Sequence, residues 1–81
     1  MFWLKFDKQE LGFKEFKITR QSIKENKGKR IVYVTNREID RIRGYAFPRY
    51  ATISEPYRNQ VLFENGDSEY IKDIIECGIE I

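Results

Sequence analysis

The chain lacks histidine altogether and contains one cysteine among its 81 residues. Histidine is the side chain that most often acts as a general base or metal ligand near neutral pH, so its absence excludes Ser-His-Asp and Cys-His sites within one chain. The lone Cys77 permits no internal disulfide and cannot supply a zinc site. Its neighbours are Glu76 and Gly78, and an adjacent carboxylate raises a thiol pKa. We therefore expect a core residue at position 77 rather than a nucleophile.

Long apolar runs and phosphate-binding loops are also absent. No stretch approaches the roughly 18 apolar residues that a membrane span needs. The first charge follows after only four apolar residues, which does not match a signal peptide. The five glycines are scattered singly and form no phosphate-cradling motif. These absences predict a cytoplasmic, non-enzymatic protein without cofactor or metal.

The charges that are present are divided unevenly along the chain. Residues 1–60 hold fourteen of the fifteen Lys and Arg, whereas residues 61–81 hold six of the thirteen Asp and Glu and a single cation, Lys72. A folded chain that separates charge in this way can present a cationic face to an anionic partner such as nucleic acid. The net charge of +2 is small for a nucleic-acid-binding domain.

The first thirty residues predict a hairpin and an exposed connection. Alternating apolar residues predict a strand over residues 2–7 and a second strand around Phe16 and Ile18. Residues 20–30 contain one large apolar residue, Ile23, and predict a solvated connection that can include one helical turn.

The middle of the chain predicts a central strand followed by a short helix. The β-branched and aromatic run over residues 31–34 is typical of a strand covered on both faces. Thr35 and Glu38 have the spacing of a capping box, and Gly44 stands where a helix C-cap is expected. This pattern predicts a helix over residues 36–43.

The last third predicts a second hairpin, a tight turn and a second helix. Residues 50–54 and 60–64 have the composition of two strands joined by a loop over residues 55–59. Asn65-Gly66-Asp67 is a strong turn signal that either closes another hairpin or leads into a helix near Ser68. The apolar residues that follow have the spacing of one helix face, which predicts a helix that begins near Ser68, ends at Cys77-Gly78 and precedes a terminal strand fragment. The residues with this spacing are Tyr70, Ile71, Ile74 and Ile75.

These elements together predict one α+β domain over residues 1–81. Its sheet is mainly antiparallel, with about four to five strands, and two short helices cover one side. The acidic residues near the C-terminus lack the spacing of a calcium loop and are interpreted as carboxylates around the start of the predicted second helix. They are Glu64, Asp67, Glu69, Asp73 and Glu76.

Arginines and tyrosines are concentrated between Arg37 and Arg58, which enclose five arginines and three tyrosines. The guanidinium fork matches phosphate oxygens, and an aromatic ring offers a face on which an unpaired base can stack. This composition predicts a nucleic-acid-binding strip, extended by two residues of the first strand. The predicted binding residues are Trp3, Lys5, Arg37, Arg41, Arg43, Tyr45, Arg49, Tyr50, Tyr57 and Arg58.

Three other interpretations of the same residues stay open. In the first, the arginines are ordinary surface residues that are solvated or paired with Glu38 or Asp40 and bind nothing. Exposed pairs of this kind add little stability. The surface can bind a protein instead, as a small viral or mobile-element inhibitor or adaptor would. A small ribonuclease without histidine is the third possibility, because Arg and Tyr are suitable residue types. An exposed edge strand would also allow a homodimer.

Overall fold

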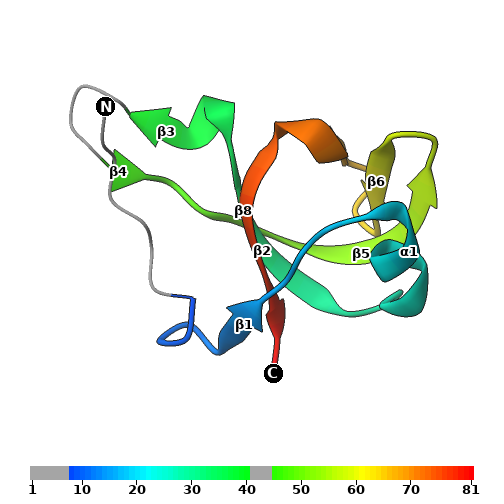
Figure 1. Cartoon of the computed structure of the whole chain (residues 1–81), viewed down its shortest axis with the longest axis horizontal. Coiled ribbons are helices and arrows are strands. Elements are labelled where there is room, and N and C mark those ends of the chain that lie inside the picture. Colours follow the sequence, from blue (N-terminus) through cyan, green and yellow to red (C-terminus); the bar gives the residue numbers. More distant parts are fainter. Residues whose placement is uncertain (1–7, 41–44) are drawn as a thin grey trace.

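The computed structural model describes residues 8–40 and 45–81 and shows a small, compact domain that is mostly sheet (Figure 1). In this part of the chain, six strands form an antiparallel sheet in the order β1-β8-β2-β5-β6-β7, and β3 and β4 form a separate two-stranded sheet. The predicted strand over residues 2–7 lies outside the described residues. The elements are β1 (Phe13–Glu15), α1 (Arg20–Glu25), β2 (Arg30–Thr35), η1 (Asn36–Glu38), β3 (Ile39–Asp40), β4 (Tyr45–Ala46), β5 (Arg49–Tyr57), β6 (Gln60–Phe63), β7 (Ser68–Tyr70), η2 (Ile71–Asp73) and β8 (Ile74–Glu80).

The central strand β2 was predicted correctly. It pairs with β8 on one edge and with β5 on the other, and its residues 31–35 are all buried. Ile31 and Tyr33 point to the inner face, where Tyr33 stacks on Phe63 with ring centroids 5.4 Å apart. Val32 and Val34 are fully buried on the opposite, outer face. The remaining members of the inner core are Ile23, Ile53, Val61, Phe63, Cys77 and Ile79.

The predicted second strand is misplaced, and the connection after it contains a longer helical segment than the single turn predicted. The strand that follows Gly12 is β1, whereas Phe16 and Ile18 lie beyond it and pack against the core. Residues 20–25 form a true helix, capped by a reciprocal pair in which Thr19 Oγ1 accepts from the Ser22 amide and Ser22 Oγ accepts from the Thr19 amide. The single apolar residue of α1, Ile23, is fully buried, and one such anchor is enough for a helix of two turns.

The predicted helix over residues 36–43 is wrong in the part that the structure describes. Residues 36–38 form the 3-10 turn η1, and β3 follows directly and pairs with β4. The reason lies in Thr35, which is the last residue of β2 and is 1% exposed. Its hydroxyl accepts from the Arg37 amide at 3.3 Å, so it stabilises a tight turn at the end of a strand instead of capping a helix.

The predicted C-terminal helix is also wrong, whereas the alternative prediction, a further hairpin closed by residues 65–67, is confirmed by the pairing of β6 with β7. Residues 68–80 form β7, η2 and β8, and the described chain therefore has one α-helix instead of two. In β8 the alternate residues Cys77 and Ile79 face the core, while Gly78 lies on the outer face against Val32. This strand has partners on both edges, β1 and β2, so the sheet supplies the backbone hydrogen bonds that a helix would have made internally. The interpretation of the nearby acids as a helix start fails with the helix.

The second hairpin and its turns agree with the sequence. β5 and β6 are joined by Arg58 and Asn59, a shorter loop than predicted because residues 55–57 remain in the strand. The turn at residues 65–67 is closed by Asn65 Oδ1, which accepts from the Asp67 amide at 2.9 Å, and Gly66 has φ +92°. Figure 1 shows this hairpin and α1 at one end of the sheet, with β3 and β4 at the other. Among the described residues, no helix has the length and apolar character to cross a membrane.

Candidate nucleic-acid interface

The structure places half of the ten predicted binding residues with their side chains. Trp3, Lys5, Arg41 and Arg43 lie outside the described residues, and only the backbone of Tyr45, in β4, is described. The other five fall at three places. Tyr57 and Arg58 lie at the β5–β6 turn, Arg37 and Arg49 lie near Glu69, and Tyr50 lies apart from both.

Tyr57 belongs to a row of three residues that crosses the sheet near the β5–β6 turn. It pairs directly with Gln60, which pairs directly with Tyr70 of β7. Directly opposed residues share one face of a sheet, and Val61, the next residue of β6, is fully buried on the other face. Tyr57 is 53% exposed and Tyr70 is 45% exposed. The row of Tyr57, Gln60 and Tyr70, here called the tyrosine row, thus lies on the solvent side of the sheet, with both tyrosines exposed and Gln60 half-buried between them. The two tyrosine backbones are about 10 Å apart.

Cationic side chains accompany this row. The Arg58 guanidinium lies over the Tyr57 ring at 5.5 Å from its centroid, and the Lys72 ammonium lies 6.0 Å from the Tyr70 centroid. Arg20 of α1 donates from Nη1 to the Arg58 carbonyl at 3.0 Å. The Arg58 and Lys72 cations thus each lie over an exposed ring, and Arg20 contacts the backbone of the same turn.

The backbone of Arg58 has φ +56°. A positive φ at the first position of a two-residue hairpin turn favours glycine, because other residues are strained there. Arg58 therefore occupies a position where its side chain does not help the turn, and where Gly would form the same turn with less strain.

Four of these residues were missed by sequence analysis, and one of them is Arg20, which lies in the predicted solvated connection. Tyr70 was assigned to the buried face of a helix, Lys72 was noted only for its charge, and Gln60 carried no functional signal. The strand register that aligns Tyr57, Gln60 and Tyr70 depends on the turn at residues 65–67, so the turn signal was the clue available in the sequence.

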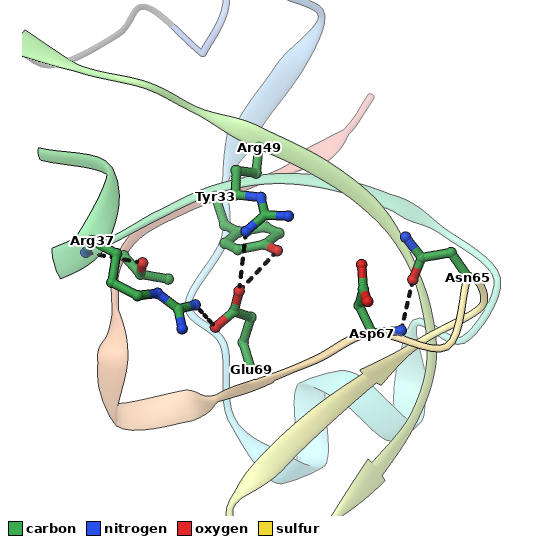
Figure 2. A network of polar contacts seen from close by, with 7 residues as sticks. Tyr33, Arg37, Arg49, Asn65, Asp67 and Glu69 are labelled. Atoms are coloured by element: carbon green, nitrogen blue, oxygen red, sulfur yellow. Dashed lines mark hydrogen bonds and ion pairs between the residues drawn. The ribbon is translucent and has the colours of Figure 1, made fainter.

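A second group of side chains converges on Glu69 of β7, as Figure 2 shows. This carboxylate is 7% exposed, and its Oε1 accepts from Nη2 of Arg37 at 2.5 Å. Its Oε2 accepts from the Tyr33 hydroxyl at 3.2 Å and lies 3.9 Å from Nη1 of Arg49. The side chains of Arg37 and Arg49 are 66% and 49% exposed. The sequence predicted both arginines but not the acid that joins them.

Tyr50 has a local structural role. Its ring lies 5.9 Å from that of Phe13 and beneath the Arg30 guanidinium, 5.1 Å from the ring centroid. It pairs with Val32 and so lies on the outer face of the sheet, away from Arg49. Tyr50 covers part of the outer core and is a suitable control position for the tyrosine row.

The remaining reactive residue, Cys77, is buried as expected. Burial raises its pKa to about 12, with a smaller contribution from the Glu15 carboxylate, so the thiol is not a nucleophile at neutral pH. Among residues 8–40 and 45–81, no group of three metal-ligating side chains converges. None of the known protein-family models matches the chain, nor do any of the curated proteins or solved structures compared with it.

Proposed function

We propose that the protein binds single-stranded nucleic acid through the tyrosine row and its three cations. The observation that carries the proposal is the alignment of Tyr57 and Tyr70 on one solvent-facing surface, each with a cation over its ring. Proteins that bind single strands without sequence preference combine stacking rings with a cationic surface in this way.

The geometry favours unpaired bases over a duplex. A ring can stack only on a base whose face is exposed, and the bases of a duplex already stack on one another. A base that stacks on Tyr57 takes the place of the Arg58 guanidinium, which then pairs with a phosphate. Gln60, between the two rings, carries an amide that both donates to and accepts from the edge of a base.

The first experiment measures the anisotropy of a labelled single-stranded oligonucleotide at about 50 mM salt. We expect Tyr57→Ala and Tyr70→Ala each to weaken binding by about 5- to 150-fold, the range that loss of one stacked base produces. Tyr50→Ala is the matched control, since its exposure is similar at 42% but it lies elsewhere, and its affinity should stay within about twofold. Equal affinity for all three variants would contradict the proposal.

The second experiment varies the salt. Three phosphate contacts on a single strand give a log-log slope near about −2, or a loss of about 20-fold between 50 and 200 mM salt. The Arg58→Gly variant should lose affinity and reduce this slope by about 0.7, while its free energy of unfolding stays equal or rises because the turn strain is relieved. A loss of binding that tracks a loss of stability would indicate a structural role instead.

A protein partner is the alternative use of the same surface, because Tyr and Arg are enriched at interface hot spots. The two functions differ in one measurement. Nucleic-acid binding is salt-dependent and is abolished by nuclease, whereas capture of a protein partner survives nuclease and is lost on Tyr57→Ala. Absence of oligonucleotide binding at about 50 mM salt would exclude the first function.

A further inference from the structure

We infer that the nucleic-acid interface continues from the tyrosine row along helix α1, so that the preferred ligand is a single strand of about 8–12 nucleotides rather than about four. This inference rests on the proposed function, because it names the length and the path of the strand that the same surface binds. The added contacts are made by Lys24 and Lys27 with phosphates of that strand.

Helix α1 meets the tyrosine row at the β5–β6 turn. Arg20, the first residue of the helix, donates from Nη1 to the Arg58 carbonyl at 3.0 Å, and the Arg58 guanidinium lies over the Tyr57 ring. The buried Ile23 packs α1 against the inner face of the sheet, whereas the tyrosine row lies on the outer face. Both lie at the same end of the sheet in Figure 1. A strand that leaves the Tyr57 ring therefore passes over the turn and reaches the helix.

The side chains of α1 are sorted by charge around the helix. At about 100° per residue, Arg20 and Lys24 lie about 40° apart, on one flank beside the buried Ile23. The carboxylate of the helix, Glu25, lies on the side opposite Ile23 and accepts from Gln21 Nε2 at 3.0 Å. Within residues 8–40 and 45–81, no carboxylate forms an ion pair with Arg20 or Lys24. This flank thus presents two cations, about one helical turn apart, to an anion.

Lys27 extends the flank in the loop that follows α1. The loop is held to β5, because the Gly28 amide donates to the Ile53 carbonyl at 2.8 Å and the Ile53 amide donates to the Lys29 carbonyl at 2.9 Å. Lys27 is exposed and forms no ion pair with another described residue. Since the backbone after it is already fixed, phosphate binding orders little more than the lysine side chain. Arg20, Lys24 and Lys27 are here called the basic flank.

The residue types on the two parts of the surface determine the ligand. A lysine ammonium is a point charge on a flexible stem, so it binds a phosphate without reading a base. The tyrosine rings supply faces on which unpaired bases stack. Residues 20–30 carry five cations and one carboxylate, so the local charge also favours a polyanion. A single strand satisfies both parts when its bases stack at the tyrosine row and its phosphates follow the basic flank.

The experiment measures the anisotropy of two labelled oligothymidylates, a short one of about 4 nucleotides and a long one of about 12, with the full chain. The short strand makes the three phosphate contacts of the tyrosine row and should give a log-log salt slope of about −2, whereas five contacts should give the long strand a slope of about −3.5. The double variant Lys24→Gln, Lys27→Gln should return the slope of the long strand to about −2 and weaken its binding by about 10- to 60-fold at about 50 mM salt. Binding of the short strand should stay within about twofold.

Lys14→Gln is the matched control for Lys24→Gln. Lys14 is exposed in β1, so the charge change is the same but the position is away from the basic flank. We expect Lys24→Gln alone to reduce the slope of the long strand by about 0.7 and Lys14→Gln to leave it unchanged. Lysine and glutamine have similar helix propensities, so α1 is retained, and a circular dichroism spectrum checks this. In the unmodified protein, the long strand but not the short one should shift the backbone amide resonances of residues 24 and 27.

The outcomes separate this inference from the proposed function. Equal salt slopes for the two strands, or an unchanged slope in the lysine double variant, would overturn the inference. The proposed function would still stand if Tyr57→Ala weakened the binding of both strands. If Tyr57→Ala and Tyr70→Ala bound both strands as tightly as the unmodified protein, the proposed function would be refuted and the inference would fall with it.

Discussion

Gly78→Ala is a substitution for which the structure predicts a sign opposite to the usual one. Gly78 lies within β8, where its backbone has no positive φ, and replacing such a glycine by alanine ordinarily stabilises a protein by about 0.4–1 kcal/mol. An added Cβ at this position, however, would lie 2.8 Å from Cδ of Lys8, 3.1 Å from the Lys14 carbonyl and 3.1 Å from Cβ of Phe13. The Lys8 side chain can move aside, but the other two atoms belong to β1 and move only with the strand.

The magnitude follows from these contacts. Overpacking of this kind costs about 1–3 kcal/mol, and the ordinary gain from removing glycine offsets part of it. We expect a net loss of about 1–2 kcal/mol in the free energy of unfolding. In a domain of this size each kcal/mol lowers the melting temperature by about 4–8 °C.

Urea unfolding followed by circular dichroism measures the loss, and hydrogen exchange of the β1 amides locates it. Gly66→Ala is the control, because its Cβ meets nothing within 4 Å and its cost arises only from the backbone at φ +92°. Both variants lose stability, but only Gly78→Ala should reduce the protection of β1 beyond the global change. Increased stability of Gly78→Ala would refute the close approach of β1 to β8.

Three further predictions concern buried polar groups. Burial raises the pKa of Cys77 to about 12, above its unfolded value of about 8.5, so the unfolded chain releases this proton at lower pH than the folded chain. The free energy of unfolding should therefore fall by about 1.4 kcal/mol per pH unit between those two values. Unfolding titrations from about pH 8 to 10.5 should show a shallower slope for Cys77→Ala. Lys8→Met removes the cation that lies 2.7 Å from the buried Glu76 carboxylate and should lower the free energy of unfolding by about 3 kcal/mol, measured by chemical unfolding. The double variant with Glu76→Gln should regain much of this loss. A double variant as unstable as Lys8→Met would contradict this prediction. Tyr33→Phe deletes the hydroxyl bonded to Glu69 and should cost about 1 kcal/mol, whereas no measurable change in the urea midpoint would show that the bond adds nothing.

Short stretches of the sequence were enough to predict the central strand and the turn at residues 65–67. The apolar run at 31–34 required burial on both faces, and β2 is buried between β8 and β5. The turn residues at 65–67 correctly ended β6. In contrast, the apolar residues after Ser68 have the spacing of a helix face because they come from three successive elements, the end of β7, the η2 turn and the start of β8.

Sequence analysis named the residue types of the proposed binding surface but not most of its positions. Tyr57 and Arg58 are adjacent in the sequence, so their partnership was visible, whereas Tyr70 joins them only through the pairing of β6 with β7. Arg37 and Glu69 are 32 residues apart, and no local pattern relates them. Long-range register of this kind is set by the whole sheet, which is why residue composition could indicate a basic aromatic surface without locating it.

Strand β5 pairs with β2 over its first half and with β6 over its second, and its pairing register shifts between Ile53 and Glu55. It therefore carries Arg49 at one end and Tyr57 at the other on a single continuous backbone. Detaching either end of β5 removes hydrogen-bond partners from a neighbouring strand. The end that carries Arg49 and the end that carries Tyr57 should therefore unfold in one cooperative step. A ligand bound at the hairpin would thereby slow amide exchange around Arg49, at the far end of the same strand.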